Sequence, residues 1–304
     1  MADETTPDFQ GDSSAIQVAS GVASGTFGRT NRVFPPIWLR LGLPRTSEEL
    51  EPLLEAAGEA SLPIDITSQP GLWGGRLRGP DRFFTYVGSS HFEHSTDQTH
   101  AANLVQADLI QTLSAIGNET IDIYFLRVRR AIEEFQINGV LEALESAKQE
   151  GHIRFLGLCC DGNPFASLSL WQFHDAFDVL QVPSNPVDQD AYETLTPLAK
   201  ERRVGILGSK TLDWLGDQPF QASSAEDSGE EIAKAYLRRA TLEHPALVNV
   251  RSATDIQAVL ESSTEDSSPE VESRLDQVIS LAVQVAQLSE SGLSSSAGSR
   301  GSNE

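Results

Sequence analysis

Short apolar runs alternate with longer segments of helical periodicity through most of the chain. A short apolar run bounded by turn residues indicates a buried strand, and apolar residues three and four positions apart indicate a helix with one buried face. The predicted helix and strand pairs are 47–60 with 63–67, 101–116 with 121–126, 139–150 with 153–158, 164–177 with 179–182, and 191–201 with 204–207. This alternation is typical of repeated βα units, so it predicts an α/β fold with a parallel sheet.

The chain divides into three parts by pattern and composition. Residues 1–14 are polar and acidic and are predicted to be a flexible tail. Residues 15–260 carry the βα pattern and have the length of one (β/α)₈ barrel. Residues 261–304 begin with an acidic linker, continue with helical apolar spacing over 270–288 and end in a polar stretch with the composition of a disordered tail. The C-terminal helix could pack on the barrel, which is the simpler interpretation, or pair with another subunit.

Charge and cysteine usage exclude several classes of protein. The formal net charge is −22, which disfavours binding to a nucleic-acid backbone. No run of about 18 apolar residues is present, so we expect no membrane-spanning helix. The N-terminus has neither the basic start nor the apolar run of a signal peptide. Cys159 and Cys160 are adjacent and form no disulfide framework, so we expect a cytoplasmic protein.

An ordered series of segments resembles the aldo/keto reductase superfamily. Residues 121–126 (IDIYFL) resemble the strand that this family writes IDLYLIH, and residues 141–157 resemble its LEAL…KEGKIRAIG segment. Residues 177–182 (FDVLQV) and 195–207 (LTPLAKERRVGIL) are similar to its FDVLQV and LLPLAKERGIGVI segments. At the N-terminus, residues 20–28 (SGVASGTFG) resemble its opening strand, LGLGTxxFG.

The resemblance implies a (β/α)₈ TIM barrel that binds NADP(H) in an extended form. The nicotinamide would lie at the end of the barrel where the carboxyl ends of the strands meet, which is where barrel enzymes keep their chemistry. In this family a tyrosine donates the proton, a lysine lowers the pKa of that tyrosine, an aspartate holds the lysine, and a histidine orients the substrate carbonyl. The expected activity is therefore NADP-dependent reduction of a small carbonyl compound.

Two members of this catalytic tetrad fall on the segment after the second predicted strand. The family aspartate matches Asp65, but the tyrosine position falls on Pro70. The nearest aromatic residue is Trp73, whose indole N–H can donate a hydrogen bond but cannot deliver a proton usefully at neutral pH. Trp73 could also be a lid over a ligand or an anchor for a surface loop.

The other two members are also replaced. The lysine position falls on Val87 or Gly88, and the histidine position falls on Arg127. Tyr86 could act as a substitute acid if its ring faced the mouth, although packing on the barrel wall is the more ordinary role. One of the four tetrad residues is retained, so the resemblance implies the fold but argues against the family's standard mechanism.

The cofactor-binding positions are partly retained. Gln181 matches the glutamine that holds the nicotinamide carboxamide, whereas a cysteine pair replaces the family's Ser-Asn pair. Ser209 replaces the stacking aromatic residue, and Arg251 could still pair with a phosphate. The cofactor-binding candidates are Thr26, Cys159, Cys160, Gln181, Ser209, Lys210 and Arg251.

Two clusters near the predicted mouth have ordinary and functional interpretations. Alternation along a strand places Arg127 and Arg129 on the same side, where they could bind an anionic ligand or pair with loop carboxylates such as Glu133 and Glu134. A second cluster crowds the loop after the third strand and could hold a metal ion, supply a general base, or simply be polar, and we assign no metal site to it. Its members are His91, Glu93, His94, Asp97 and His100.

Three functional hypotheses remain open from the sequence. The first is an aldo/keto reductase-like protein whose standard hydride mechanism is disabled and which binds a nucleotide or another anionic small molecule. The second is an enzyme with a rebuilt site, an atypical oxidoreductase or a non-redox lyase or isomerase, that uses Arg127 with Tyr86 or His91. The third is a metal-dependent enzyme built on the histidine-rich loop.

Overall fold

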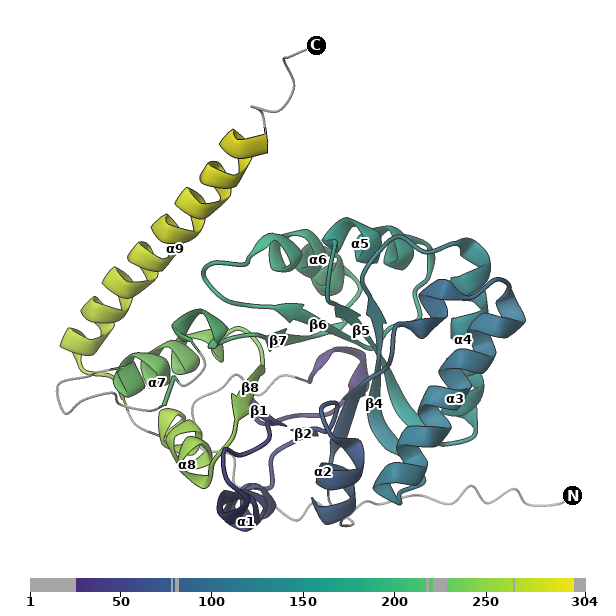
Figure 1. The fold of residues 1–304 in the computed structure, drawn as a ribbon, viewed down its shortest axis with the longest axis horizontal. Helices are drawn as coiled ribbons and strands as arrows, with labels where there is room; N and C mark the ends of the chain where they lie inside the picture. The colour runs from purple at the N-terminus through teal and green to yellow at the C-terminus, as the bar shows by residue number, and fades with distance from the viewer. Residues whose placement is uncertain are drawn as a thin grey trace, which may run out of the picture.

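Eight parallel strands close into a barrel in chain order, β1 to β8, and helices surround it (Figure 1). This computed structural model describes residues 26–77, 79, 82–216, 219–220, 229–264 and 266–297. The strands are β1 (Ile37–Leu41), β2 (Ile64–Asp65), β3 (Phe84–Val87), β4 (Ile121–Val128), β5 (Ile153–Cys160), β6 (Val179–Pro183), β7 (Gly205–Ser209) and β8 (Ala246–Val250). The predicted (β/α)₈ barrel is confirmed.

The helices follow the strands in the expected order; α1 to α8 form the outer layer, and α9 extends beyond it. They are α1 (Leu50–Ala60), α2 (Pro70–Leu77), α3 (Gln98–Ile116), α4 (Glu134–Gln149), α5 (Pro164–Phe173), α6 (Asp190–Glu201), α7 (Gly229–Ala240), α8 (Ala253–Ser262) and α9 (Pro269–Ala297). Each predicted helix is present with shifted ends. The helix predicted over 164–177 ends at Phe173, and the strands predicted over 121–126 and 153–158 both run two residues further towards the mouth.

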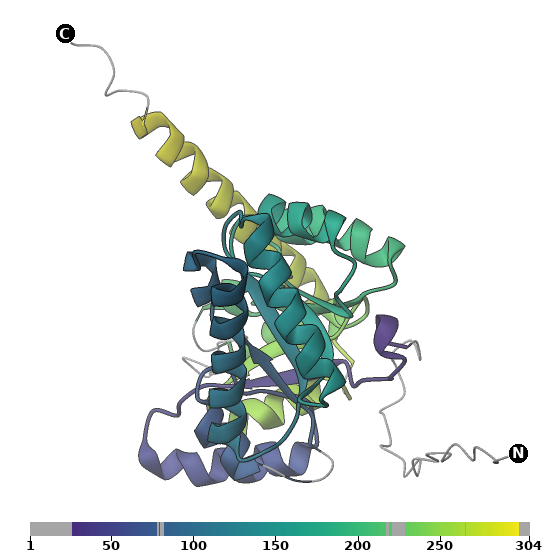
Figure 2. The same ribbon diagram turned by 90° about the vertical axis from the view of Figure 1, so that its right-hand side faces the viewer.

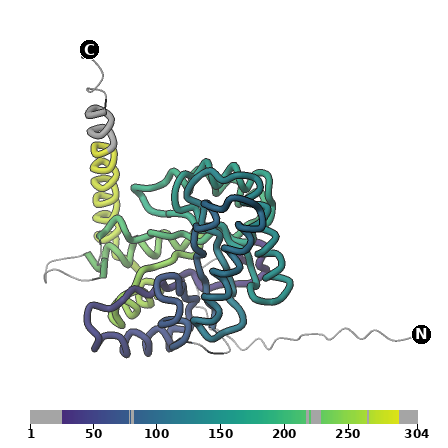
Figure 3. The backbone as a smooth tube through the Cα atoms, turned by 45° about the vertical axis from the view of Figure 1, so that its right-hand side comes forward, coloured from purple at the N-terminus to yellow at the C-terminus, as the bar shows by residue number. Residues whose placement is uncertain are grey.

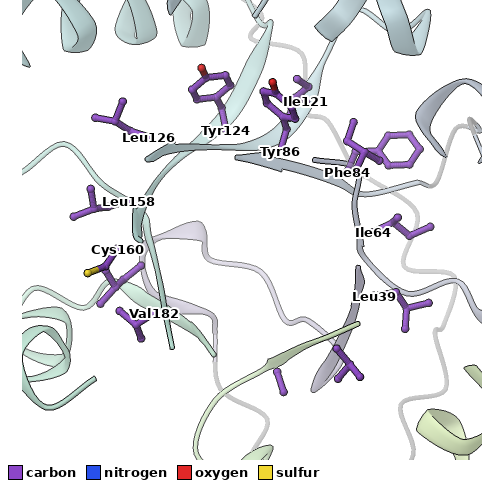
Figure 4. Close-up of a cluster of buried hydrophobic side chains, with 14 of the residues drawn as sticks. Leu39, Ile64, Phe84, Tyr86, Ile121, Tyr124, Leu126, Leu158, Cys160 and Val182 are labelled. Carbon is purple, nitrogen blue, oxygen red and sulfur yellow. The ribbon is translucent and has the colours of Figure 1, made fainter. Parts of the chain in front are cut away.

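Alternation along each strand separates the barrel interior from the layer between strands and helices. Figure 4 shows Leu39, Tyr86, Leu126 and Leu158 pointing away from the centre of the barrel. Their neighbours along the strands form a separate interior cluster, with Trp38, Val87, Ile123, Phe125, Cys159, Val179, Leu207 and Leu247 among its members. Both faces of the strands are therefore buried, as in other parallel barrels.

An aromatic cluster closes the interior at the amino ends of the strands. The ring of Phe27 lies 5.6 Å from that of Trp38, and the ring of Phe34 lies 4.8 Å from that of Phe83. Gly28, which begins the short helix η1 (Gly28–Thr30), has φ +54° and packs so closely on Gly205 that a Cβ atom would lie 2.1 Å from the Gly205 nitrogen. The described chain thus begins by covering the amino end of the barrel.

This arrangement corrects the expected opening strand. Residues 20–25 of the proposed motif lie outside the described residues, and Thr26 to Gly28 lie at the amino end of the barrel. The first strand is β1, Ile37–Leu41, which pairs with both β2 and β8 and closes the barrel. The motif over residues 20–28 resembles the family's opening strand in sequence, but the first strand is formed by the apolar residues of 37–41.

The last helix is anchored on the barrel at its start and extends away from it. Leu275 is fully buried, and Arg239 of α7 forms ion pairs with Glu272 at 2.6 Å and Asp276 at 2.8 Å. Figures 1 to 3 show α9 running out beyond α7 towards the C-terminus. The predicted tail over 289–304 is helical as far as Ala297, and both residues 298–304 and the predicted N-terminal tail lie outside the described residues. In the described part of the chain, no helix has the length and apolar character needed to cross a membrane.

Candidate ligand-binding site at the mouth of the barrel

Polar side chains line the interior where the carboxyl ends of the strands meet, which we call the mouth. Hydrogen-bonding register places Arg127, Cys159 and Gln181 side by side on β4, β5 and β6. On the other half of the barrel, Arg40 lies beside Asp65 in register on β1 and β2. Because strand neighbours in register face the same side, the strands bring these five residues into one polar rim.

A two-point ion pair joins the first two strands across this rim. The Nε and Nη2 atoms of Arg40 lie 3.2 and 3.3 Å from the two carboxylate oxygens of Asp65. The Asp65 side chain is fully buried, and its carboxylate also accepts a hydrogen bond from the Thr67 backbone. Burial lowers the pKa of Arg40, but the Asp65 carboxylate outweighs burial and the pKa is raised overall. Arg40 therefore stays protonated at any moderate pH.

A second arginine–aspartate cluster lies across the mouth. Nε of Arg127 lies 3.6 Å from Oδ2 of Asp161, and Nη2 of Arg129 lies 3.5 Å from the same oxygen. The two arginines thus share one side of the strand end, as the alternation predicted. Arg127 is only about a quarter exposed, and its Nε has no hydrogen-bond partner among the described residues. One carboxylate oxygen shared by two guanidinium groups leaves donor capacity for an anionic ligand.

The adjacent cysteines point to opposite sides of β5. Cys159 belongs to the interior cluster, whereas Cys160 packs in the layer beneath the helices (Figure 4). Both are free thiols. Burial raises the pKa of Cys159 to about 12, although the charges of Arg127 and Arg40 act in the opposite direction. Cys159 is therefore a neutral thiol at the mouth, and only this one of the two cysteine candidates faces the interior.

Two buried polar atoms at the mouth lack partners. Gln181 is 2% exposed and Thr85 is fully buried, yet Oε1 of Gln181 and Oγ1 of Thr85 have no hydrogen-bond partner among the described residues. A buried polar atom without a partner costs free energy, and such atoms are rare in folded proteins. A ligand that donates a hydrogen bond inside the mouth would satisfy the glutamine.

A cavity of about 280 Å³ leads outward from the mouth to the start of α8. It is lined by the interior residue Leu247, by Asn249, and by Arg45 and Arg251 beside the helix N-terminus. Ser252 caps that N-terminus by accepting a hydrogen bond from the backbone of Asp255. A helix N-terminus beside two arginines suits a phosphate, although Glu49, Asp213 and Asp255 line the same cavity and reduce its positive charge.

Two aromatic candidates, Trp73 and Tyr86, lie outside the strands and not at the mouth. Trp73 is fully buried in the layer outside the strands, where its indole N–H donates to Oγ of Ser68 at 3.0 Å, so it is neither a lid nor a surface anchor. The ring of Tyr86 points towards the helices, and its hydroxyl donates to Asp108 of α3 at 3.2 Å (Figure 4). Burial and Asp108 raise the pKa of Tyr86 to about 12. Packing on the barrel wall, the more ordinary of the two roles considered for Tyr86, is therefore the one observed, and the ring does not face the mouth as the substitute-acid role requires.

The fold also shows where the remaining cofactor-binding and lysine-position candidates lie. Thr26 lies at the opposite end of the barrel from the mouth and cannot contact a cofactor bound there. Ser209 is buried at the carboxyl end of β7, next to the exposed Lys210, which adopts a left-handed backbone conformation with φ 53°. Val87, one of the two positions that could match the family's lysine, belongs to the interior cluster and presents an apolar side chain there.

The histidine-rich loop after β3 is held in place by contacts with Arg129 and Arg130. Glu93 is buried, accepts a hydrogen bond from the Arg129 backbone at 2.9 Å and pairs with Nε of Arg130 at 3.6 Å. His91 is exposed, and His94 contacts Arg130. Among the described residues, no group of three or more His, Cys, Asp or Glu side chains is arranged to hold a metal ion. Of the two roles considered for the arginines of this region, pairing with carboxylates is the one observed, and the partners are Asp161 and Glu93 rather than Glu133 or Glu134.

Sequence reasoning missed Arg40, which is central to the site. The signal was present, because Arg40 is the one charged residue in the otherwise apolar strand IWLRL. It was overlooked because the opening strand was assigned elsewhere. Asp161, Arg45 and Asn249 follow or end strands and could have been found by the rule that barrel sites lie at the carboxyl ends of strands.

This combination defines a (β/α)₈ barrel with a charged mouth and an outward-leading cavity beside β8. Among solved structures, it is similar to an aldo/keto reductase from Klebsiella pneumoniae in complex with NADP and acetate, with a TM-score of 0.64 and 16% identity over 85% of this chain and 96% of that chain. It is also similar to the holo form of an aldo-keto reductase from Bacillus halodurans, with a TM-score of 0.61 and 13% identity over 84% of this chain and 94% of that chain. An aldo-keto reductase from a Medee basin deep-sea metagenome library gives a TM-score of 0.62 and 15% identity over 84% of this chain and 94% of that chain.

The resemblance expected from the sequence is thereby confirmed at the level of the fold: the chain has the barrel of the aldo/keto reductases. No protein-family model matches the sequence, and no curated protein matches it.

Proposed function

We propose that this protein binds NADP(H) at the mouth of the barrel and does not carry out the carbonyl reduction typical of aldo/keto reductases. The bound nucleotide would supply a hydride. The site residues named above, however, include no group suited to donate the proton that must accompany hydride delivery to a carbonyl. The protein would then act as a nucleotide-binding pseudoenzyme.

The observation that carries this proposal is the Arg40–Asp65 ion pair. The family resemblance implies that this aspartate holds a lysine whose charge lowers the pKa of a tyrosine. Here the guanidinium of Arg40 occupies both carboxylate oxygens of Asp65. A guanidinium stays protonated at any physiological pH, so it can bind an anion but cannot donate a proton to an alkoxide.

The residues present fit the two ends of a nicotinamide dinucleotide. The unpartnered Oε1 of Gln181 could accept a hydrogen bond from the carboxamide N–H. At the other end, Arg45 and Arg251 in the cavity beside α8 could pair with a phosphate. The three acidic residues of that cavity weaken this pairing, so we expect lower affinity than a wholly basic pocket would give.

Titration of the full-length protein with NADPH, followed by nucleotide fluorescence, tests the binding. We expect saturation below about 500 µM, which corresponds to a binding free energy of about −4.5 kcal/mol. Arg251→Ala should weaken binding about tenfold, since a charge-assisted hydrogen bond to phosphate contributes about 1.5–3 kcal/mol. Arg76→Ala, which removes a surface arginine that pairs with Glu51 outside this cavity, is the matched control and should leave the affinity unchanged. A flat titration would overturn the proposal.

The second half of the proposal is tested by turnover. A panel of aldehydes and ketones with saturating NADPH should give no enzyme-dependent oxidation of the nucleotide. Turnover at about 1–1,000 per second, the ordinary range for enzymes, would show that a proton donor operates at the mouth and would contradict the pseudoenzyme assignment.

A further inference from the structure

The outer half of α9, residues 277–289, carries exposed apolar side chains. Leu281 is 62% exposed, Val285 is 55% exposed and Leu288 is 71% exposed, while Val278 is half-buried. Large apolar side chains gathered on one helix face mark an interaction surface more often than scattered ones do. We call Val278, Leu281, Val285 and Leu288 the α9 seam.

The spacing of the seam is that of a two-stranded coiled coil. Its members follow one another at intervals of three, four and three residues, so they lie along one side of the helix. Valine occupies both positions of one type and leucine both positions of the other. A β-branched residue at position a with leucine at position d favours pairing of two like helices.

The charge distribution favours a second copy of the chain as the partner. The protein carries a net charge of −22, yet no charged residue lies between Asp276 and Glu290. Two copies repel each other over most of their surface, and a charge-free segment held away from the barrel is where their contact costs least. The absence of lysine and arginine between Arg274 and Arg300 disfavours an anionic membrane as the partner.

The inner half of the helix holds the seam in a fixed direction. Val271 packs against the core beside the buried Leu275, and Val278 and Ile279, at the start of the outer half, also contact the core. The ion pairs of Arg239 with Glu272 and Asp276 fix the rotation of the helix about its axis. Figure 2 shows the outer half projecting clear of the barrel, so a second helix has access to the seam.

We propose that two copies of this chain associate through their α9 seams to form a two-fold symmetric dimer. The interface is isologous, because the same four residues of each copy meet their counterparts. This inference is independent of the proposed nucleotide binding, which concerns residues at the mouth of the barrel and in the cavity beside α8, none of them in α9.

Sedimentation equilibrium of the full chain tests the proposal. The unaltered protein should be a dimer, and a double variant with Leu281→Gln and Val285→Gln should dissociate at least tenfold more readily. Glutamine preserves helix propensity, so the helix itself should remain. The matched control is Ile110→Gln, which removes a comparably exposed apolar side chain (64% exposed) from α3 and should leave the dimer intact.

Two further results decide the matter. Raising the salt concentration should tighten the dimer, because salt screens the repulsion between two acidic copies while the apolar seam remains; weakening by salt would indicate an interface of ion pairs and would overturn the proposal. A monomer at all concentrations, or a double variant that dimerises as well as the unaltered protein, would overturn it too. Equal urea midpoints for variant and control would exclude unfolding as the cause of dissociation.

Discussion

The two ends of the barrel interior differ sharply in chemistry. The amino end is filled by aromatic rings from Phe27, Phe34, Trp38 and Phe83, with centroids 4.8–5.7 Å apart. The carboxyl end carries charged and polar groups, some of which have no hydrogen-bond partner in the part of the chain that the structure describes. In barrel proteins the amino end serves stability and the carboxyl end serves ligands. Here the contrast implies that substitutions at one end should alter folding, and at the other end binding.

The largest expected effect is at the aromatic end. Trp38 is fully buried, and its indole N–H donates to the Pro35 carbonyl at 3.2 Å. Trp38→Ala should lower the free energy of unfolding by about 3–5 kcal/mol, because it removes a large buried side chain and leaves a cavity. Urea denaturation measures the loss, with the exposed Leu242→Ala as control. NADPH affinity of the folded fraction should be unchanged, and a parallel loss of affinity would show that the two ends are coupled.

A smaller effect is expected where charge is buried at the mouth. Asp65→Ala leaves the Arg40 guanidinium without its carboxylate partner and should cost about 2–3 kcal/mol of unfolding free energy. Arg40 is 28% exposed, so water compensates for part of the loss. The double variant Arg40→Met with Asp65→Leu replaces the pair by apolar side chains and should recover most of the stability. A double variant as unstable as the single one would show that the pair itself stabilises the barrel.

The amino-acid pattern predicted the βα alternation because burial and helical period are local properties of a sequence. The same local rule placed Arg127 and Arg129 on one side of β4. The Arg40–Asp65 pair depends instead on the register between β1 and β2, which local pattern does not specify.

The direction of the Tyr86 side chain on β3 was left open for a related reason. In a parallel barrel both strand faces are apolar, so periodicity does not tell the interior from the helix layer. Interior positions could be assigned only once Trp38 and Phe125 were seen to pack across the lumen.

A pH effect should follow from the buried thiol at the mouth. The pKa of Cys159 is raised to about 12, whereas an unfolded cysteine ionises near pH 8.5–9. Above about pH 9 the unfolded chain releases this proton and the folded chain does not, so stability is lost as pH rises towards 12. This group should contribute a slope of about 1.4 kcal/mol per pH unit. Unfolding free energies between pH 8.5 and 10.5 should fall less steeply for Cys159→Ala, and an equal slope would place the thiol in water.

The smallest expected effect tests whether a polar group at the mouth lowers the stability of the fold and raises the affinity for the ligand. Gln181 is buried and its Oε1 atom lacks a partner among the described residues, so Gln181→Leu removes an unsatisfied polar group at nearly constant volume. The free energy of unfolding should stay the same or rise by about 1 kcal/mol. NADPH affinity should meanwhile fall about fivefold, because the hydrogen bond to the ligand is lost. Urea denaturation and fluorescence titration of the same samples measure both quantities. If stability fell and affinity held, Gln181 would belong to the structural core and the polar rim would end at Cys159.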